Sequence, residues 1–248
     1  MESDEPFVVF DQQDSGCLSY GVERDGRRLF VKTAQTPSAC TSLRRAIAFH
    51  AAVRHPAIVA PEEVTDTLET TRIVYPWRDG TVLNHATVAG SNRSALERFR
   101  TLELGLVLAA IGTIIAAHEA VANAGFVSVD LYDGCFLYDF DRHELWLIDL
   151  DEYRPGPFVL DADRLPGSRR YMAPEEFERG ATIDQRTMVF HLGQTIAELL
   201  DMEEGSRCST PQRQLVEEAT SEDPDRRPST VAELAAAWRG VQRSGRTS

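Results

Sequence analysis

The sequence predicts an α+β protein made of two lobes, a small β-rich N-lobe and a mostly helical C-lobe. Extended runs with one helical segment fill the first part of the chain, and helical segments dominate the rest. The composition changes after Arg78-Asp79-Gly80, which indicates a hinge near 76–80. We therefore expect an N-lobe over 1–78, a C-lobe over 79–242 and a frayed tail over 243–248. The lobes together form one domain with a ligand cleft between them.

In the predicted N-lobe, the clearest local signal is Asp25-Gly26, a hairpin dipeptide between two extended runs. The helical segment ends at His55-Pro56, because a residue before proline avoids helical backbone angles. Pro76 marks an edge or the end of the last extended run. The expected strands cover 7–10, 18–24, 27–33, 57–64 and 70–77, and the expected helix covers 42–54.

In the predicted C-lobe, the most apolar stretch is the second half of a helix expected over 94–124. Two short strands, joined by the turn DFDRHE, come next, and a proline-containing loop separates them from further helices. The strands are expected at 135–138 and 145–150, and the helices at 174–178, 185–200, 211–219 and 230–239.

The composition is that of a globular protein, with 42% hydrophobic and 26% charged residues. The net charge of −13 argues against a nucleic-acid partner, which requires a basic face. The four cysteines form no CxxC pair, which argues against a structural zinc site and fits a reducing compartment. The acidic start is unlike a signal peptide, and the apolar run 104–117 is short for a membrane span. We expect a soluble, cytoplasmic protein without a membrane partner.

Five short stretches contain residue types that can do chemistry. They are LFVKT with Lys32, SVDLYDGC with Asp130, Asp133 and Cys135, LIDLDEY with Asp149 and Asp151, GSRRYMAPEE with Ser168 and Glu175, and EDPDRRPS with Arg227. Taken singly, each has an ordinary explanation, since a strand lysine is usually solvated and an acidic turn is usually only a turn. Their order and spacing together are more specific.

In that order, and together with HPAIV at 55–59, the five stretches resemble the motifs of the protein kinase family, in particular bacterial serine/threonine kinases. LFVK is similar to V-A-I-K, HPAIV to H-P-N-I-V, SVDLYDGC to H-R-D-L-K-P-x-N, LIDLD to the segment around D-F-G, GSRRYMAPE to G-T-x-x-Y-M-A-P-E, and DPDRRPS to D-P-x-x-R-P-S. The resemblance extends from about residue 7 to residue 238. It implies a two-lobed kinase-like fold that uses ATP and Mg²⁺ to phosphorylate a protein that the sequence does not specify.

The resemblance also implies a role for each residue of the catalytic site. Lys32 would contact the α- and β-phosphates, Asp149 would bind Mg²⁺, and Asp130 would orient the acceptor hydroxyl and take its proton. The adenine edge would meet the Pro76 carbonyl and the Arg78 N–H.

Three further residues have roles outside the phosphate site. Ser168 stands at the threonine of the G-T pair, which favours serine/threonine specificity, although a loop hydroxyl bonded to nearby backbone is the plainer interpretation. Arg227 would pair with Glu175 in a buried ion pair that joins the activation segment to the last helices.

Two departures from the family pattern concern the phosphate side of the site. The glycine-rich loop retains only Gly16 and Gly21, so Ser15 and Ser19 are candidate substitutes for its missing contacts. Ala46 stands where the family has the helix αC glutamate. Lys32 must then use Asp149 or a carboxylate elsewhere, which the sequence leaves open.

The other departures concern the catalytic loop and the acceptor side. Val129 replaces the arginine that would bind an activation-loop phosphate, so we expect any activity to be independent of activation-loop phosphorylation. Tyr132 replaces the family's lysine. Cys135 replaces the metal-binding asparagine, and a thiol is a poor ligand for Mg²⁺. Asp133 and Asp151 are candidate replacement ligands. The region 200–211 is short, so the αG docking helix is truncated or missing.

Three hypotheses follow. The first is an active, atypical serine/threonine protein kinase, supported by the retained Lys32, Asp130 and Asp149. The second is a pseudokinase that binds nucleotide or a partner without turnover. The third is a small-molecule kinase on the same fold. The oligomeric state and the acceptor stay open.

Overall fold

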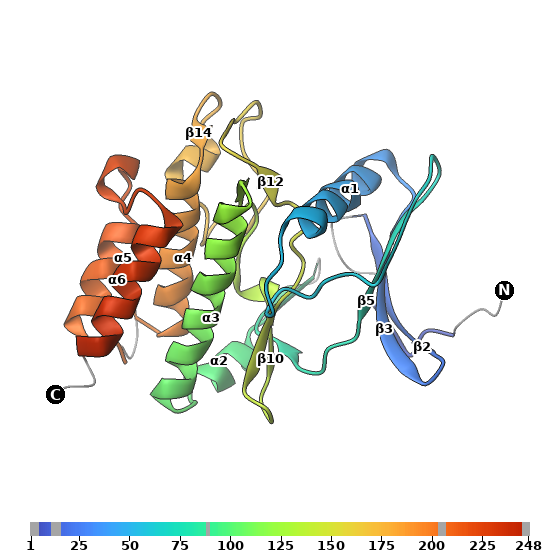
Figure 1. Cartoon of the computed structure of the whole chain (residues 1–248), viewed down its shortest axis with the longest axis horizontal. Coiled ribbons are helices and arrows are strands. Elements are labelled where there is room, and N and C mark those ends of the chain that lie inside the picture. Colours follow the sequence, from blue (N-terminus) through green and yellow to red (C-terminus); the bar gives the residue numbers. More distant parts are fainter. Residues whose placement is uncertain (1–4, 11–15, 88–89, 203–206, 245–248) are drawn as a thin grey trace.

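The structure is a computed structural model that describes residues 5–10, 16–87, 90–202 and 207–244. The chain is a mixed α/β protein with 40% helix and 23% strand. The strands of the main sheet and helix α1 lie at the N-terminal end of the molecule, and the long helices α3, α4, α5 and α6 lie side by side at the other end (Figure 1). The predicted α+β order of elements is thus present.

The main sheet has five antiparallel strands in the order β1-β2-β3-β5-β4. They are β1 Val8–Phe10, β2 Leu18–Arg24, β3 Arg27–Ala34, β4 Glu63–Asp66 and β5 Thr71–Pro76. Asp25 and Gly26 connect β2 to β3 with φ values of 52° and 71°, the left-handed backbone that a two-residue hairpin needs. The predicted strand over 57–64 is wrong for most of its length. Instead, the Ala57 carbonyl accepts from the Leu147 N–H at 2.7 Å, and Ile58 forms a single parallel bridge with Leu147 in the C-terminal part of the chain.

Helix α1, Pro37–Ala52, packs against β3 and β5. It begins five residues before the predicted start because Thr36 caps it, with its hydroxyl accepting from the Ala39 N–H at 3.3 Å. Pro37 at the first helical position has the φ angle that a helix requires. The helix ends before His55-Pro56, as predicted.

The C-terminal part contains α2 Ser94–Arg100, α3 Leu104–Asn123, α4 Gln185–Leu199, α5 Thr210–Ala219 and α6 Val231–Ser244. The single helix predicted over 94–124 is two helices. Thr101 ends the first, because its N–H and its hydroxyl both bond to the Arg98 carbonyl, at 3.1 and 2.7 Å. The helices predicted at 185–200 and 211–219 are confirmed to within one residue at each end. The helix predicted at 230–239 is α6, which continues to Ser244 and includes the first two residues of the tail expected over 243–248; the other four lie outside the described residues.

Short elements connect these helices. They are the strands β6 Thr81–Val82, β7 His85–Thr87, β8 Gly90–Asn92, β9 Phe126–Val127, β10 Phe136–Asp139, β11 Glu144–Leu147, β12 Arg154–Pro155, β13 Phe158–Val159 and β14 Thr182–Ile183, and the 3₁₀ turns η1 Asp133–Cys135, η2 Pro174–Phe177 and η3 Pro224–Arg226. The helix predicted at 174–178 is the turn η2. Strand β10 pairs with both β6 and β11 in a second small sheet.

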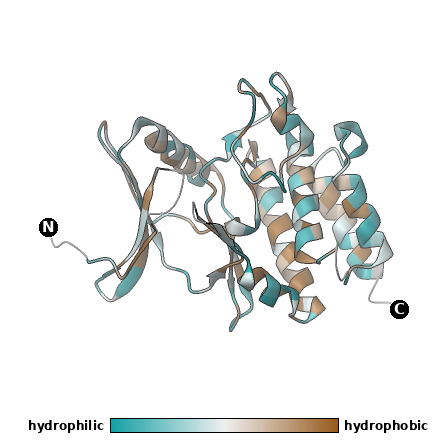
Figure 2. Cartoon of the chain, turned by 180° about the vertical axis from the view of Figure 1, so that it is seen from behind, coloured by the Kyte–Doolittle hydropathy of each residue, from teal (hydrophilic) through white to brown (hydrophobic). Residues whose placement is uncertain are grey.

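One large apolar core fills the C-terminal part and extends to Phe49 of α1, and a smaller core lies between α1 and the main sheet. Figure 2 shows apolar residues concentrated along the central long helices. Among the described residues, α3 is the one helix long and apolar enough to cross a membrane. It contacts α4, α6 and β9, which is compatible with the core helix of a soluble protein.

Candidate functional site

A cavity of about 360 Å³ lies between the main sheet and the small β6-β10-β11 sheet. Five of the residues predicted from sequence line it: Lys32, Pro76, Arg78, Asp149 and Asp151. They come from β3, from the end of β5 and the residues after it, and from the loop after β11. The remaining predicted residues, Gly16, Asp130, Asp133, Ser168, Glu175 and Arg227, are not in its lining.

Lys32 is the cation of this cavity. Its ammonium donates to Asp149 Oδ1 and, at 2.5 Å, to Asp151 Oδ2. Burial by itself lowers the pKa of Lys32, but the two carboxylates outweigh burial and hold that pKa well above the usual value. Burial raises the pKa of Asp151 in spite of the adjacent Lys32. The question left open by Ala46 thus has an answer, since both Asp149 and Asp151 serve as partners of Lys32.

Asp149 and Asp151 are also the residues that could hold Mg²⁺. Both are hard-oxygen donors, and the Asp149 side chain is 41% exposed, so it is accessible from the cavity. The described residues contain no cluster of three or more His, Cys, Asp or Glu side chains arranged for a metal. The donor set therefore fits Mg²⁺ bound through one or two carboxylates together with ligand phosphates, which is the usual mode for this ion.

The segment after β5 provides the backbone groups predicted for the adenine edge. The Trp77 N–H donates to the Arg28 carbonyl at 3.0 Å, and Pro76 lies opposite Leu29. In that antiparallel register, the Pro76 carbonyl is directed away from β3. The Arg78 guanidinium stacks over the Trp146 ring at 5.7 Å.

Aromatic side chains form much of the apolar wall of the cavity. Phe10, Phe30, Tyr75 and Trp77 all line it. Phe30 lies 6.0 Å from Phe10 and 6.5 Å from Trp77 between ring centroids, so the rings form a contiguous group. Such a wall suits a planar aromatic ligand.

His50 was missed by the sequence reasoning, which had no signal for it. It lies near the end of α1, lines the cavity and is 6% exposed. Its ring contacts the Tyr75 ring edge-on at 5.5 Å between centroids, and its Nδ1 has no hydrogen-bond partner. Burial and the nearby Arg54 and Lys32 lower the pKa of His50 to about 4, so the ring is neutral at pH 7.

Asp130 lies on the loop between β9 and β10, with φ = 60°, a conformation that L-residues seldom adopt. Its carbonyl accepts from the Cys135 thiol at 3.4 Å. Gly167 packs against it so closely that a Cβ there would lie 3.4 Å from Asp130 Oδ1. This places Asp130 against the 167–173 segment, and its predicted catalytic role stays a prediction.

Asp133, the candidate replacement metal ligand, is held by other side chains in the structure. Its carboxylate is fully buried and accepts from Asn84 at 2.8 Å, from Arg93 Nε at 3.1 Å and from Arg170 Nη2 at 3.2 Å. Arg93 and Arg170 also bind the Glu198 carboxylate. Two arginines therefore bridge two carboxylates, and this ion cluster occupies the oxygens that a metal would need.

Cys135 stands at the position of the missing asparagine and is fully buried in the large core. Burial raises the pKa of its thiol well above the usual value, with nearby Asp130 and Asp149 acting in the same direction. A protonated, buried thiol is an inert group. The interpretation of Cys135 as a small core side chain therefore fits the structure.

The structure describes the glycine-rich loop from Gly16 onward, and Ser15 lies outside the described residues. Gly16 has φ = 70°, which favours glycine there. At Gly21, a Cβ would lie 2.5 Å from the exposed Phe7 ring, so a larger residue there would require that ring to move. Ser19 is fully buried and is not in the cavity lining, so it is not placed to contact a phosphate there.

Glu175 and Arg227 form the predicted buried pair. Arg227 Nη1 and Nη2 donate to the two Glu175 oxygens at 2.7 and 3.0 Å. Burial alone raises the pKa of Glu175, but hydrogen bonds from Arg227 and Thr187 bring that pKa below its usual value. Ser168, in the same segment, accepts from the Tyr171 N–H through its carbonyl at 2.9 Å.

A second group missed from the sequence joins this segment to the loop before Asp130. Ser128 bonds to His191 Nδ1 at 2.9 Å, and His191 Nε2 bonds to Glu176 at 2.6 Å. All three side chains are almost fully buried, and none lines the cavity. The group therefore anchors three segments and is closed to substrate.

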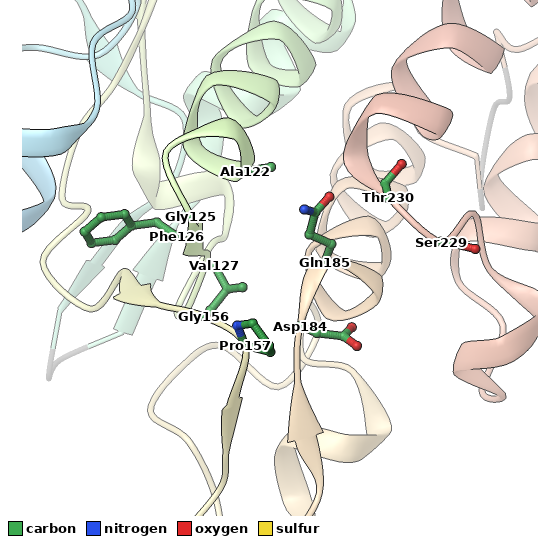
Figure 3. A pocket seen from close by; sticks show the side chains of 10 residues that line it. All are labelled: Ala122, Gly125, Phe126, Val127, Gly156, Pro157, Asp184, Gln185, Ser229 and Thr230. Atoms are coloured by element: carbon green, nitrogen blue, oxygen red, sulfur yellow. The ribbon is translucent and has the colours of Figure 1, made fainter.

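A second hollow of about 240 Å³ lies between the end of α3, the start of α4 and the start of α6 (Figure 3). None of the predicted site residues lines it, and its walls are made by residues such as Gly125, Pro157 and Gln185. No protein-family model matches the chain, and no curated protein matches it.

Proposed function

We propose that the chain is a protein kinase-like phosphotransferase. In this proposal it binds ATP in the 360 Å³ cavity and transfers the terminal phosphoryl group to a serine or threonine hydroxyl of a protein. The observation that carries the proposal is that Lys32, Asp149 and Asp151 meet in one cavity. Lys32 is 117 positions from Asp149 and 119 positions from Asp151 in the chain. A buried ammonium and two carboxylates suit the binding of phosphates and their metal ion, and the aromatic wall beside them suits the binding of a base.

The proposed roles follow from the contacts. Lys32 would exchange part of its carboxylate contacts for the phosphates of the nucleotide, while Asp149 and Asp151 would hold Mg²⁺. The metal supplies neutralisation of the charge that develops on the phosphoryl oxygens. Asp130 would hold the acceptor hydroxyl and accept its proton. The Pro76 carbonyl and the Arg78 N–H would bind the base.

The proposed fold is the two-lobed kinase fold. The main sheet with α1 would form the N-lobe and the helical part the C-lobe, connected after β5. The buried Glu175–Arg227 pair supports this, since the resemblance anticipates it. We also propose a cytoplasmic location, because Cys40 and Cys135 are buried thiols that form no disulfide.

A second candidate function is nucleotide binding without transfer. The observation that favours it is the state of the catalytic loop, where Asp133 is committed to the arginine cluster and Cys135 is buried. Neither residue then replaces the lost metal ligand, and the metal site rests on Asp149 and Asp151 alone.

The test is an incubation of purified protein with labelled ATP and Mg²⁺, with and without a generic protein acceptor. Asp130→Asn is the test variant, and Asp163→Asn, with a side chain 93% exposed, is the matched control. Transfer to protein that is lost only in Asp130→Asn supports the proposal. Thermal stabilisation by nucleotide without transfer supports the second candidate. Transfer only to metabolites indicates a small-molecule kinase, and neither binding nor transfer overturns both proposals.

A further inference from the structure

Helix α1 has no acidic residue that could reach Lys32. Its sequence, PSACTSLRRAIAFHAA, carries Arg44 and Arg45 and no Asp or Glu. Ala46 is fully buried in the core between α1 and the sheet. The helix must therefore connect to the charged site by some group other than a carboxylate of its own.

The connection runs through Glu152, which follows Asp151 directly in the chain. One Glu152 oxygen accepts from Ser42 Oγ and from Arg45 Nη2, both at 2.5 Å, and the other accepts from Arg154 at 3.3 Å. Arg45 also donates to Ser42 at 2.8 Å. Two adjacent side chains of α1 thus hold one carboxylate of the loop after β11.

A run of four consecutive residues of this loop, 149–152, contacts both strand β3 and helix α1. Asp149 and Asp151 bind Lys32 of β3, and Glu152 binds Ser42 and Arg45 of α1. Glu152 and Asp151 share one rigid peptide unit, so a shift of the Glu152 backbone displaces the backbone of Asp151 as well. A displacement of α1 that pulls on Glu152 is therefore expected to alter the positions of Asp151 and Asp149.

We propose that Arg45 and Ser42 are positioning residues, which hold Glu152 and thereby set the arrangement of Asp149 and Asp151 around Lys32. In the arrangement expected from the resemblance, a carboxylate of the helix would pair with Lys32. Here the charges are reversed, because the helix carries the cation, Arg45, and the loop carries the anion, Glu152. The consequence for Mg²⁺ and nucleotide rests on the proposed function, whereas the positioning itself does not.

A neighbouring ion pair on the same helix shows why this contact differs from an ordinary surface pair. Arg44 binds Asp66 at 3.0 Å, with side chains 44% and 40% exposed, and such pairs contribute little. Arg45 and Glu152 are 28% and 18% exposed, and Glu152 accepts from three side chains. Arg44→Met is therefore a matched control for Arg45→Met.

The first experiment measures hydrogen exchange of the ligand-free protein by mass spectrometry over residues 148–154. In Arg45→Met and in Glu152→Gln, exchange of this segment should become about tenfold faster, the change expected when a charge-assisted hydrogen bond is lost. Arg45→Lys should lie closer to the wild type, and Arg44→Met should equal it. Unchanged exchange in Arg45→Met and Glu152→Gln, or an equal effect in Arg44→Met, overturns the proposal.

The second experiment measures the affinity of a non-hydrolysable ATP analogue with Mg²⁺ and with a chelator. Arg45→Met should lose most of the Mg²⁺-dependent gain in affinity and keep the metal-free affinity, while Arg44→Met keeps both. A thermal stability loss with an intact Mg²⁺-dependent gain would show that Arg45 is only structural. If the wild type binds no nucleotide, the proposed function fails, and the exchange experiment still decides the positioning role.

Discussion

Replacing Arg227 by alanine tests how the C-terminal part of the chain is held together. The Arg227 side chain is fully buried, and the Glu175 side chain is 10% exposed. Alanine removes both hydrogen bonds to Glu175 and leaves that carboxylate with the Thr187 hydroxyl. It also removes donors from the Ser221 and Arg186 carbonyls, at 2.7 and 3.1 Å. Breaking one side of a buried ion pair costs about 3–5 kcal/mol.

Urea unfolding followed by tryptophan fluorescence measures this loss, since Trp238 is buried in the same core. For a chain of this size, the loss corresponds to a fall in Tm of roughly 6–20 °C. The exposed neighbour Arg226 is the control, and Arg226→Ala should change stability by less than about 0.5 kcal/mol.

The pH dependence adds a second check. Because Arg227 and Thr187 lower the pKa of Glu175, the pair stabilises the protein fully above the unfolded pKa of about 4.3. This stabilisation is lost as the pH falls through the lower, folded pKa. The difference between wild type and Arg227→Ala should therefore shrink below about pH 4. Arg227→Met combined with Glu175→Leu should recover part of the stability, because no buried charge is then left unpaired. A loss below about 1 kcal/mol, or one equal to that of Arg226→Ala, would refute the reasoning.

Three other outcomes follow from the buried groups. Burial lowers the pKa of His50 and of His118 to about 4, so both rings are neutral in the folded protein near pH 7. The stability that depends on their neutral state is complete above the unfolded pKa of about 6.5 and is lost as the pH falls towards 4. When the pH falls from 7 to 5, each of the two histidines should lower the free energy of unfolding in urea by about 2 kcal/mol. A free energy of unfolding that is unchanged over this range would contradict the neutral state of the two rings. Cys135 should resist alkylation in native protein and react in urea, as read by mass spectrometry; equal rates in both would contradict its burial. Lys32→Met should abolish the rise in Tm with nucleotide, and a retained rise would show that the nucleotide binds elsewhere.

Local signals predicted the fold well where one residue type had a single structural use. Asp25-Gly26 placed the first hairpin because few other dipeptides adopt its backbone. The break between α2 and α3 was missed because the helical pattern runs on through it. The Thr101 hydroxyl donates to the Arg98 carbonyl at the end of the first helix, a contact that periodicity does not show.

The sequence predicted which residues belong to the candidate site, but it predicted much less well which distant residues contact each other there. Lys32 and Asp149 came from motif order, and the structure brings them into contact. The direction of Asp133 could not be predicted, because its partners Arg93 and Arg170 lie 40 and 37 positions away in segments without motif signals. His50 was missed for the same reason, since only the packing of α1 against the sheet directs it into the cavity.

The ion cluster of Asp133, Glu198, Arg93 and Arg170 bears on the order of folding. Arg93 and Glu198 are 105 positions apart, so their contact closes a very long loop. Contacts of that range form after local ones, because the entropy of loop closure must first be overcome. A contact absent from the transition state affects the rate of unfolding and leaves the rate of folding nearly unchanged. The cluster should therefore form late in folding. Its loss should increase the rate of unfolding more than it decreases the rate of folding, and so shorten the lifetime of the native state.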